Sequence, residues 1–583
     1  MFKTYSLYRL LPYLQRYRFK LFYGAACLLV TNVFALAQPW ILKKVIDSLS
    51  LEITTEKLLF YSGLVVGFSF AEGLFRFLMR RILIGVSRYI EYDLRNDFFA
   101  HMEKLSLSFF HRMKTGDLMS RSTNDLGAVR MVLGPGIMYS MNTLVISTVA
   151  TILLFSISWR LTLIALLPLV FVSICVKKFG EEIHKRFDKI QEQYAEISAK
   201  AQENLSGIRV VKAYAREESE IRSFETLNRL YVQKALALVR VSGAFHPLLG
   251  LLLGFSSVAL LWIGGRQVIE HRMTLGDMVA FMGYLAMLIW PTIALGWVVN
   301  IFQRGAASMS RMLRIWDTVP EIRDGDDLAP VDRISGEIEF CHLTFSYEPG
   351  QAPALKDINL QIPQGATLAI VGKTGAGKST LVNLILRIYD PPPGALLVDG
   401  VPVERIPLAV LRSHIGYVPQ ETFLFSDTVK ENMAFGVAQG DPQEVERVAK
   451  VADIYDDVMS FPNHFDTLVG ERGITLSGGQ KQRTAIARAL LTDPRILILD
   501  DALSSVDTYT EEKILRGLSA VMRQRTTILI SHRISTVKRA DHIIVLDEGR
   551  IVEQGRHEDL LTLGGLYAEL NKKQLLEEEL AEF

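Results

Sequence analysis

The chain has 583 residues, more than one compact domain usually contains, so several domains are expected. Its 64 Lys and Arg against 63 Asp and Glu leave a net charge of +1, which excludes a strongly basic nucleic-acid-binding protein. Apolar residues make up 49%, which favours a membrane-embedded part. The three cysteines, Cys27, Cys175 and Cys341, lie far apart, so they form neither a metal-ligand motif nor a disulfide framework.

The first half of the chain, residues 1–310, contains long runs without Asp, Glu, Lys or Arg. Five such runs are 21–42, 131–159, 161–176, 241–265 and 278–303. A sixth candidate begins near Leu58 and carries charged residues late in its length. Since a helix needs about 20 apolar residues to cross the hydrocarbon core, we predict six transmembrane helices.

Basic residues indicate the orientation of these helices. Five of them and no acid occupy the first 20 positions: Lys3, Arg9, Arg16, Arg18 and Lys20. The segment 76–130 is also rich in Arg and Lys, and the positive-inside rule therefore predicts a cytoplasmic N-terminus. A signal peptide with "ALA" at 35–37 is the alternative interpretation of the first run. The length of that run and the five that follow favour a transmembrane helix.

Two polar excursions, at roughly residues 80–130 and 177–240, have a helical pattern and predict helices that extend beyond the membrane. "TGDLMSRSTND" (115–125) and "LSGIRVVKAYAREE" (205–218) interrupt them. Each is expected to touch a cytoplasmic partner domain, and ordinary helix–helix loops are the alternative.

Glu72 and Arg76 lie inside the second predicted span, four residues apart. That spacing places them on one helix face, where they can form an ion pair. Alternatively, Glu72 faces a cavity and attracts cationic compounds.

The second half of the chain changes character. Residues 311–335, with Pro320 and Pro330, are predicted to be a linker. From 336 to 575, short β-branched strands alternate with helices and glycine turns, which predicts an α/β domain with a mostly parallel sheet. The fold class is therefore an all-α six-helix transmembrane domain fused to an α/β domain. Residues 576–583 are predicted to be a solvated acidic tail.

A phosphate-binding loop opens the α/β domain. "GKTGAGKST" fits the pattern G-x-x-x-x-G-K-[ST] between a strand and a helix. Its backbone amides and the helix N-terminus are expected to cradle phosphates, with Lys378 at the terminal phosphates and Ser379 on Mg²⁺. The loop comprises Gly372, Lys373, Thr374, Gly375, Ala376, Gly377, Lys378, Ser379 and Thr380. ATP and Mg²⁺ are the predicted ligands.

Two further motifs complete the predicted site. "RILILD" ends an apolar strand at Asp500, which is expected to hold Mg²⁺ and to place Asp501 near the terminal phosphate. "LSGGQ" then forms a second anion-binding helix start, with the residues Ser477, Gly478, Gly479 and Gln480. Two phosphate-binding surfaces in one domain make sense if one of them faces a second copy or a homologue.

Taken together, these motifs resemble an ABC exporter half-transporter (type IV exporter fold) over essentially the whole chain. The resemblance implies that Tyr347 stacks on adenine, that Gln420 senses Mg²⁺, and that His532 contacts the terminal phosphate. It implies that Asp507 crosses a dimer interface and that "VGERG" (469–473) is the exporter-specific loop. It also matches 115–125 and 205–218 to the family's two coupling segments.

Position 501 departs from the family pattern, because a Glu normally stands there to handle the attacking water. Asp501 is one methylene shorter, and a shift of about 1 Å at a catalytic group can cost on the order of 10²-fold in rate. We therefore expect a site that binds ATP and hydrolyses it slowly. The alternative is that Asp501 serves adequately after a small adjustment of the backbone. Because "LSGGQ" is intact, the resemblance implies a heterodimer with a homologous half-transporter that carries the catalytic Glu.

The resemblance implies export of hydrophobic or amphipathic compounds, drugs or lipids, across the cytoplasmic membrane, with the ATPase domain in the cytoplasm. Membrane lipids are implied partners and nucleic acid is not. A homodimeric lipid flippase is the first alternative. An ATP-gated channel or a regulator is the second.

Overall fold

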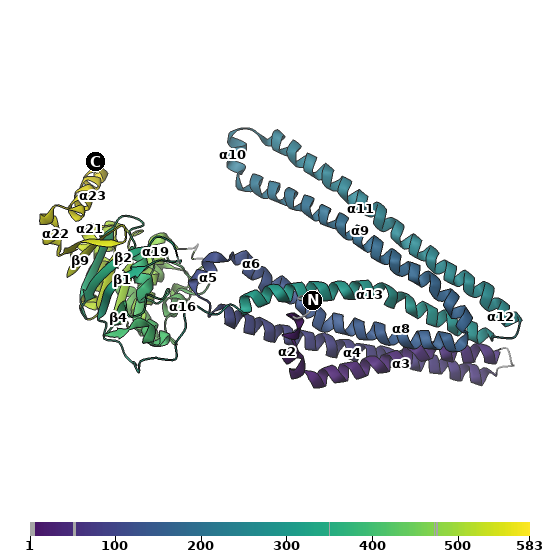
Figure 1. Ribbon diagram of the computed structural model, residues 1–583. Helices are drawn as coiled ribbons and strands as arrows, with labels where there is room; N and C mark the ends of the chain where they lie inside the picture. The colour runs from purple at the N-terminus through teal and green to yellow at the C-terminus, as the bar shows by residue number, and fades with distance from the viewer. Residues whose placement is uncertain (1–5, 50–53, 349, 471–472, 474–475, 583) are drawn as a thin grey trace. The chain divides into compact units, whose positions relative to one another are not determined.

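The computed structural model describes residues 6–49, 54–348, 350–470, 473 and 476–582. The chain forms two compact units, which are considered separately (Figure 1). Unit 1 comprises residues 1–103 and 114–318, and unit 2 comprises residues 104–113 and 319–583.

Unit 1 is entirely helical. Its first elements are α2 (Leu11–Arg16), α3 (Arg18–Leu49), α4 (Thr55–Met102), α6 (Thr115–Ser120), the π-helical η1 (Arg121–Asp125), α7 (Leu126–Met131), the π-helical η2 (Val132–Gly136) and α8 (Ile137–Ile157). Then follow α9 (Trp159–Ser206), α10 (Ile208–Ala213), α11 (Glu217–Ala259), the π-helical η3 (Leu260–Gly264), α12 (Gly265–Ile269) and α13 (Leu275–Trp316). Within the described residues, six helical stretches are long and apolar enough to cross a membrane, which confirms the six predicted spans.

Long polar extensions follow the spans in both predicted excursions. α4 and α9 each have 48 residues, about 72 Å at the helical rise, which is far more than the hydrocarbon core requires. α9 and α11 lie side by side, and α10 connects them within the predicted segment 205–218 (Figure 1). The other predicted segment, 115–125, forms α6 and η1 inside unit 1.

The helices of unit 1 pack through large apolar side chains and a few specific polar contacts. Phe281 and Tyr284 of α13 are buried in a cluster with Leu154 of α8 and Leu161 of α9. Thr274 caps α13 by accepting a hydrogen bond from the Asp277 amide at 3.0 Å. The predicted pairing within α4 is confirmed, because Arg76 and Glu72 form an ion pair.

Unit 2 contains two sheets. Their strands are β1 (Ile338–Phe345), β2 (Leu355–Ile362), β3 (Thr367–Gly372), β4 (Leu396–Val398), β5 (Val401–Pro402), β6 (Ile415–Val418), β7 (Ile496–Asp500), β8 (Thr526–Ile530), β9 (His542–Asp547) and β10 (Arg550–Gly555). The four-stranded sheet is antiparallel with the order β2-β1-β4-β5. The six-stranded sheet has the order β10-β9-β3-β8-β7-β6 and is parallel except at β10.

Unit 2 also contains helices, and one of them, α5, comes from the first half of the chain. They are α5 (Leu107–Arg112), α14 (Lys378–Ile385), α15 (Leu408–Ser413), α16 (Val429–Ala434), α17 (Pro442–Val451), α18 (Tyr455–Ser460), α19 (Gly478–Leu491), α20 (Thr508–Met522), α21 (Ile534–Val537), α22 (His557–Leu563) and α23 (Leu566–Glu582), with the 3₁₀ turns η4 (Val403–Arg405) and η5 (His464–Asp466).

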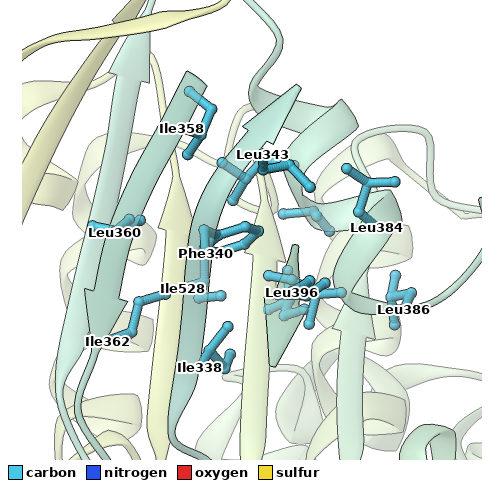
Figure 2. Close-up of a cluster of buried hydrophobic side chains, with 14 of the residues drawn as sticks. Ile338, Phe340, Leu343, Ile358, Leu360, Ile362, Leu384, Leu386, Leu396 and Ile528 are labelled. Atoms are coloured by element: carbon cyan, nitrogen blue, oxygen red, sulfur yellow. The ribbon is translucent and has the colours of Figure 1, made fainter. Parts of the chain in front are cut away.

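One apolar cluster of unit 2 contains residues from both of its sheets. Phe340 and Leu343 of β1 lie in this core with Leu396 of β4, Ile528 of β8 and Leu384 of α14 (Figure 2). The helix that follows the phosphate-binding loop is therefore anchored in the same core as the strands that carry the site.

Two predicted boundaries fall within helices. α13 continues to Trp316, so the start of the predicted linker at 311 is still helical. α23 includes most of the predicted tail as backbone, while the side chains from 577 onward and residue 583 lie outside the described residues.

Candidate nucleotide site

The predicted site residues meet at one edge of the six-stranded sheet. β3, β8, β7 and β6 are mutually parallel neighbours, so their carboxyl ends lie together. Gly372 ends β3, Asp500 ends β7, His532 follows β8, and Gln420 follows β6. The crevice outside the carboxyl ends of parallel strands is where open α/β sheets bind ligands.

The glycine loop adopts a conformation that other residues would strain. Gly372 has φ +153°, and a Cβ there would lie 2.2 Å from the carbonyl oxygen of Leu546. Gly377 has φ +101° and starts α14, with the Ala354 carbonyl oxygen 2.9 Å from a Cβ position. Only glycine fits these positions, so the backbone can curl as a phosphate cradle requires.

Lys378 is turned into the glycine loop. Its ammonium group donates to the carbonyl oxygens of Gly372 at 2.8 Å and Lys373 at 3.0 Å. Burial lowers the pKa of Lys378, and the carboxylates of Asp501 and Asp500 oppose that shift. The cation therefore already lies within the electrostatic field of both acids.

Asp500 is 2% exposed at the end of β7. Burial raises the pKa of its carboxyl group, while a hydrogen bond from Ser379 lowers it. Its Oδ1 is buried and has no hydrogen-bond partner among the described residues. A buried carboxylate oxygen without a donor, next to a hydroxyl group, fits a hard cation such as Mg²⁺, which prefers oxygen ligands.

Asp501 is 6% exposed and lies against the residue predicted to contact the terminal phosphate. Its Oδ1 accepts a hydrogen bond from the His532 amide at 3.2 Å, and its Oδ2 lies 3.4 Å from His532 Nε2. Asp501 has φ +47°, a left-handed conformation that Asp tolerates better than most residues. Asp501 and His532, two of the three predicted catalytic residues with Asp500, are thus in direct contact.

An aromatic group borders the glycine loop. The Tyr347 hydroxyl and the Thr380 hydroxyl are 2.8 Å apart, so Tyr347 lies beside the loop as predicted for an adenine-stacking residue. Its ring centroid is 5.0 Å from that of Tyr389, in an edge-to-face contact. We did not predict Tyr389, and an isolated aromatic after a helix carries no sequence signal for this position.

The signature residues form the N-terminus of α19. Ser477 and Gln480 make a reciprocal capping box: Gln480 N donates to Ser477 Oγ at 3.2 Å, and Ser477 N donates to Gln480 Oε1 at 3.0 Å. A Cβ at Gly478 or Gly479 would lie 3.2 Å from atoms of Ser505. The two glycines therefore allow a close approach to the loop that follows β7.

A buried glutamine that we did not predict ties the signature helix to that loop. Gln482 is 4% exposed, donates to Ser504 Oγ at 2.9 Å, and accepts from the Ser505 amide at 2.9 Å. A polar residue on the buried face of a helix was the available signal, because such a group needs partners.

The remaining predicted residues are placed with fewer contacts. Gln420 is exposed and makes no side-chain hydrogen bond among the described residues. Asp507 caps α20 by accepting from the Thr510 amide at 2.9 Å. The predicted exporter-specific loop is outside the described residues at 471–472. The roles of these residues in Mg²⁺ sensing and across an interface stay predictions.

One connection lies away from the nucleotide site. Glu321, next to the predicted linker's Pro320, accepts a hydrogen bond from Arg112 Nη2 at 2.9 Å and one from Ser106 Oγ at 3.1 Å. It also accepts one from Ser108 Oγ. These bonds join the short helix α5 to Glu321 within unit 2, and α5 directly precedes the segment 115–125 that was predicted to touch a partner domain.

Comparisons with known proteins agree with this arrangement. The family model of the ABC transporter transmembrane region matches residues 21–292, and the ABC transporter model matches residues 355–504. The chain is 38% identical to the probable multidrug resistance ABC transporter ATP-binding/permease protein YheI of Bacillus subtilis, over 94% of each chain. It is 36% identical to the multidrug resistance-like ATP-binding protein MdlA of Escherichia coli, over 98% of this chain and 97% of MdlA.

The chain is also similar to a lipid flippase and to a solved exporter structure. An ATP-dependent lipid A-core flippase of Desulfotalea psychrophila is 36% identical over 96% of this chain and 97% of its own length. The structure of a bacterial Atm1-family ABC exporter with ATP bound superposes with a TM-score of 0.78 at 30% identity, covering 96% of this chain and 98% of that one.

Proposed function

Because this chain belongs to the ABC transporter family, as an exporter half-transporter with an ATP-hydrolysing domain, we propose that it works in a heterodimer whose two ATP sites are unequal. In this proposal, the site built on Lys378, Asp500 and Asp501 binds ATP and hydrolyses it slowly. The partner is a homologous half-transporter that carries Glu at the position of Asp501.

The observation that supports unequal sites is the contrast between Asp501 and α19. The Asp501 carboxylate is held against His532 and reaches one methylene less far than a Glu would. The signature helix, in contrast, has its capping box and both glycines in place. A chain with Asp at the catalytic position and an intact signature fits a partner that has Glu at this position and an altered signature.

The transport cycle follows from differential ATP affinity. In the family's mechanism two ATPase domains close head to tail, each ATP lying between the glycine loop of one and the signature of the other. ATP binds the closed pair better than the open one, so it shifts the membrane halves toward the outward-open state. Ser379, Asp500 and Gln420 would hold Mg²⁺, which supplies charge neutralisation at the phosphates.

We further propose that the cargo is a hydrophobic or amphipathic compound and that the ATPase domain lies in the cytoplasm. The basic residues among the first 20 positions support that orientation. The multidrug relatives named above support the cargo class.

The test compares ATP turnover of this chain alone and together with a homologous half-transporter that carries Glu at the position of Asp501. Alone, the chain should bind ATP and turn it over slowly. Asp501→Glu should raise that turnover by about 10²-fold, because the carboxylate then reaches the attacking water. Robust turnover by the unaltered chain alone, abolished in Asp501→Asn, would contradict the unequal-site proposal.

A homodimeric lipid flippase is the second candidate, favoured by the similarity to the lipid A-core flippase. The ATP turnover of the chain purified alone distinguishes the two functions. Lipid-stimulated turnover in a homodimer, without any homologue, would select the flippase.

A further inference from the structure

A cavity of about 600 Å³ lies within unit 1, lined by residues of α3, α4, α8 and α13. Most of its lining residues lie within the predicted spans, whereas Arg80 lies at the start of the polar segment 80–130. Polar and charged side chains at membrane depth are expensive, so they indicate a functional site. The charges that line this cavity therefore identify what it can bind.

The one acid of the cavity is already neutralised. Glu72 accepts a hydrogen bond from Gln38 Nε2 at 2.8 Å and forms an ion pair with Arg76. Its side chain is only 13% exposed. With two donors in place and little accessible surface, Glu72 is a poor partner for an incoming cation, which argues against the cation-attracting role considered from the sequence.

Two side chains that line the cavity have donors without an acceptor in the part of the chain that the structure describes. Arg80 lines the cavity and makes no ion pair or hydrogen bond with any described residue. Asn32 is 2% exposed, and its Nδ2 is buried without a hydrogen-bond partner among those residues. Glu72, Arg76 and Arg80 together leave a net charge of +1 on the wall. The buried Nδ2 of Asn32 and the exposed guanidinium of Arg80 both lack an acceptor among the described residues, and together they are complementary to an anion.

The rest of the lining is apolar and adaptable. Met79, Met138 and Met287 line the cavity together with Trp290. Methionine side chains are flexible and polarisable, so they accommodate apolar groups of different shape. An amphipathic ligand would therefore find both an apolar surface and a cationic one.

We propose that this cavity binds an amphipathic compound whose polar end is an anion, with that end at Arg80 and Asn32 and the apolar body against the methionines and Trp290. The proposal deepens the export function proposed above by assigning the charge class of the cargo. The anion has two possible sources, a lipid headgroup or a free amphiphile, and they share this chemistry.

Binding is measured on the full-length chain in phosphatidylcholine nanodiscs without ATP. Two brominated alkyl amphiphiles with the same chain are compared, one ending in a sulfonate and the other in a trimethylammonium group. The signal is tryptophan quenching that is lost in Trp290→Phe. The sulfonate should bind about tenfold more tightly than the ammonium, as expected for a charge-assisted contact.

Arg80→Gln should remove most of that difference, and Asn32→Leu should reduce it. The matched control is Arg81→Gln, because Arg81 is the next residue of α4 and does not line this cavity. Arg80→Glu, which keeps a charged group at that position, should reverse the preference.

Equal affinities in the unaltered chain, or equal effects of Arg80→Gln and Arg81→Gln, would overturn the proposal. A second arm replaces the amphiphiles with brominated phosphatidylglycerol or phosphatidylcholine. Quenching specific to phosphatidylglycerol assigns a lipid headgroup, and quenching by the sulfonate alone assigns a free amphiphile. The measurement uses neither ATP nor a partner chain, so its failure leaves the heterodimer proposal to its own test.

Discussion

At the scale of single residues, the neighbouring acids Asp500 and Asp501 lie in two different environments. Asp500 lies at the end of a buried strand with an oxygen that no described donor satisfies, whereas the Asp501 carboxylate is engaged by His532. The backbone turns to a positive φ at Asp501, which directs the two side chains differently. Adjacent acids can therefore serve a cation and a water molecule without competing.

The buried charge of Asp500 leads to a prediction about stability and function. Burial raises its pKa, so the folded state binds the proton more tightly than the unfolded chain, and the carboxylate lowers the free energy of unfolding at neutral pH. Asp500→Asn should raise the melting temperature without Mg²⁺ and weaken Mg²⁺-dependent ATP binding by about 10- to 100-fold. Thermal unfolding and nucleotide titrations check both.

The gain in stability should shrink as the pH falls toward the raised pKa of Asp500, because the unaltered carboxyl is then neutral as well. Over the same range, Mg²⁺-dependent affinity of the unaltered chain should decrease, since the proton competes with the cation. Asp456→Asn, at an exposed residue of α18, is the control. A lower melting temperature together with intact Mg²⁺ dependence would contradict this account.

At the scale of elements, the start of α13 is held against the end of α3. The Gly276 amide donates to Asp47 Oδ1 at 2.9 Å. A Cβ at Gly276 would lie 2.4 Å from the carbonyl oxygen of Lys43, a backbone atom that cannot rotate away. This close approach explains a glycine in the first turn of a long helix.

Gly276→Ala should therefore destabilise unit 1 by about 1–3 kcal/mol, the usual cost of overpacking. The melting temperature of the detergent-solubilised chain measures this effect. Gly296→Ala on the same helix is the control, because the nearest atom to its Cβ would be Val176 Cγ1 at 4.0 Å. Alanine favours helices over glycine, so the control should be neutral or slightly stabilising. Equal melting temperatures of the two variants would refute the steric argument.

The same elements show which features were predictable from the sequence. Five uncharged runs and a sixth with charges late in its length predicted six spans, because the hydrocarbon core imposes a length. "ILILD" predicted β7, because a buried strand must be apolar. The position of α5 was not predictable: its six residues carry no periodic pattern, and Glu321, which binds it, lies more than 200 positions later. Likewise, nothing local to Arg80 and Asn32 shows that α3 and α4 bring them to one cavity.

At the scale of the whole molecule, the segment Lys104–Met113, which contains α5, belongs to unit 2, whereas the rest of the first 318 residues belongs to unit 1. The chain leaves unit 1 after Glu103 and returns at Lys114, so both neighbouring segments of α5 lie in the membrane unit. His111 Nδ1 also lies 3.3 Å from the hydroxyl of Tyr389, whose ring contacts Tyr347 beside the glycine loop. The chain on both sides of α5 therefore continues into helices of unit 1, while His111 of α5 contacts the border of the nucleotide site within unit 2.

If α5 transmits the state of the ATPase, then weakening its attachment should uncouple transport from hydrolysis. Glu321→Ala removes the acceptor for Ser108, Ser106 and Arg112, a loss of about 1 kcal/mol because the pair with Arg112 is largely exposed. The cargo-stimulated part of ATP turnover in the assembled transporter should fall about fivefold, while unstimulated turnover and ATP affinity stay unchanged. Asp332→Ala, at an exposed residue of the linker, is the control.

The pH dependence of this attachment separates a coupling role from a general loss of structure. The hydrogen bond from Ser108 is the main cause that lowers the pKa of Glu321 below its usual value, so the attachment is present above that value and is lost only as pH falls through the lowered pKa. Cargo stimulation in the unaltered transporter should consequently be constant between about pH 6 and 8, as Glu321 remains ionised throughout. Glu321→Gln keeps an acceptor without the charge and should retain an intermediate stimulation. If cargo stimulates ATP turnover of Glu321→Ala as strongly as that of the unaltered transporter, then α5 does not carry the coupling. The segment 115–125 would then be the next candidate for that role.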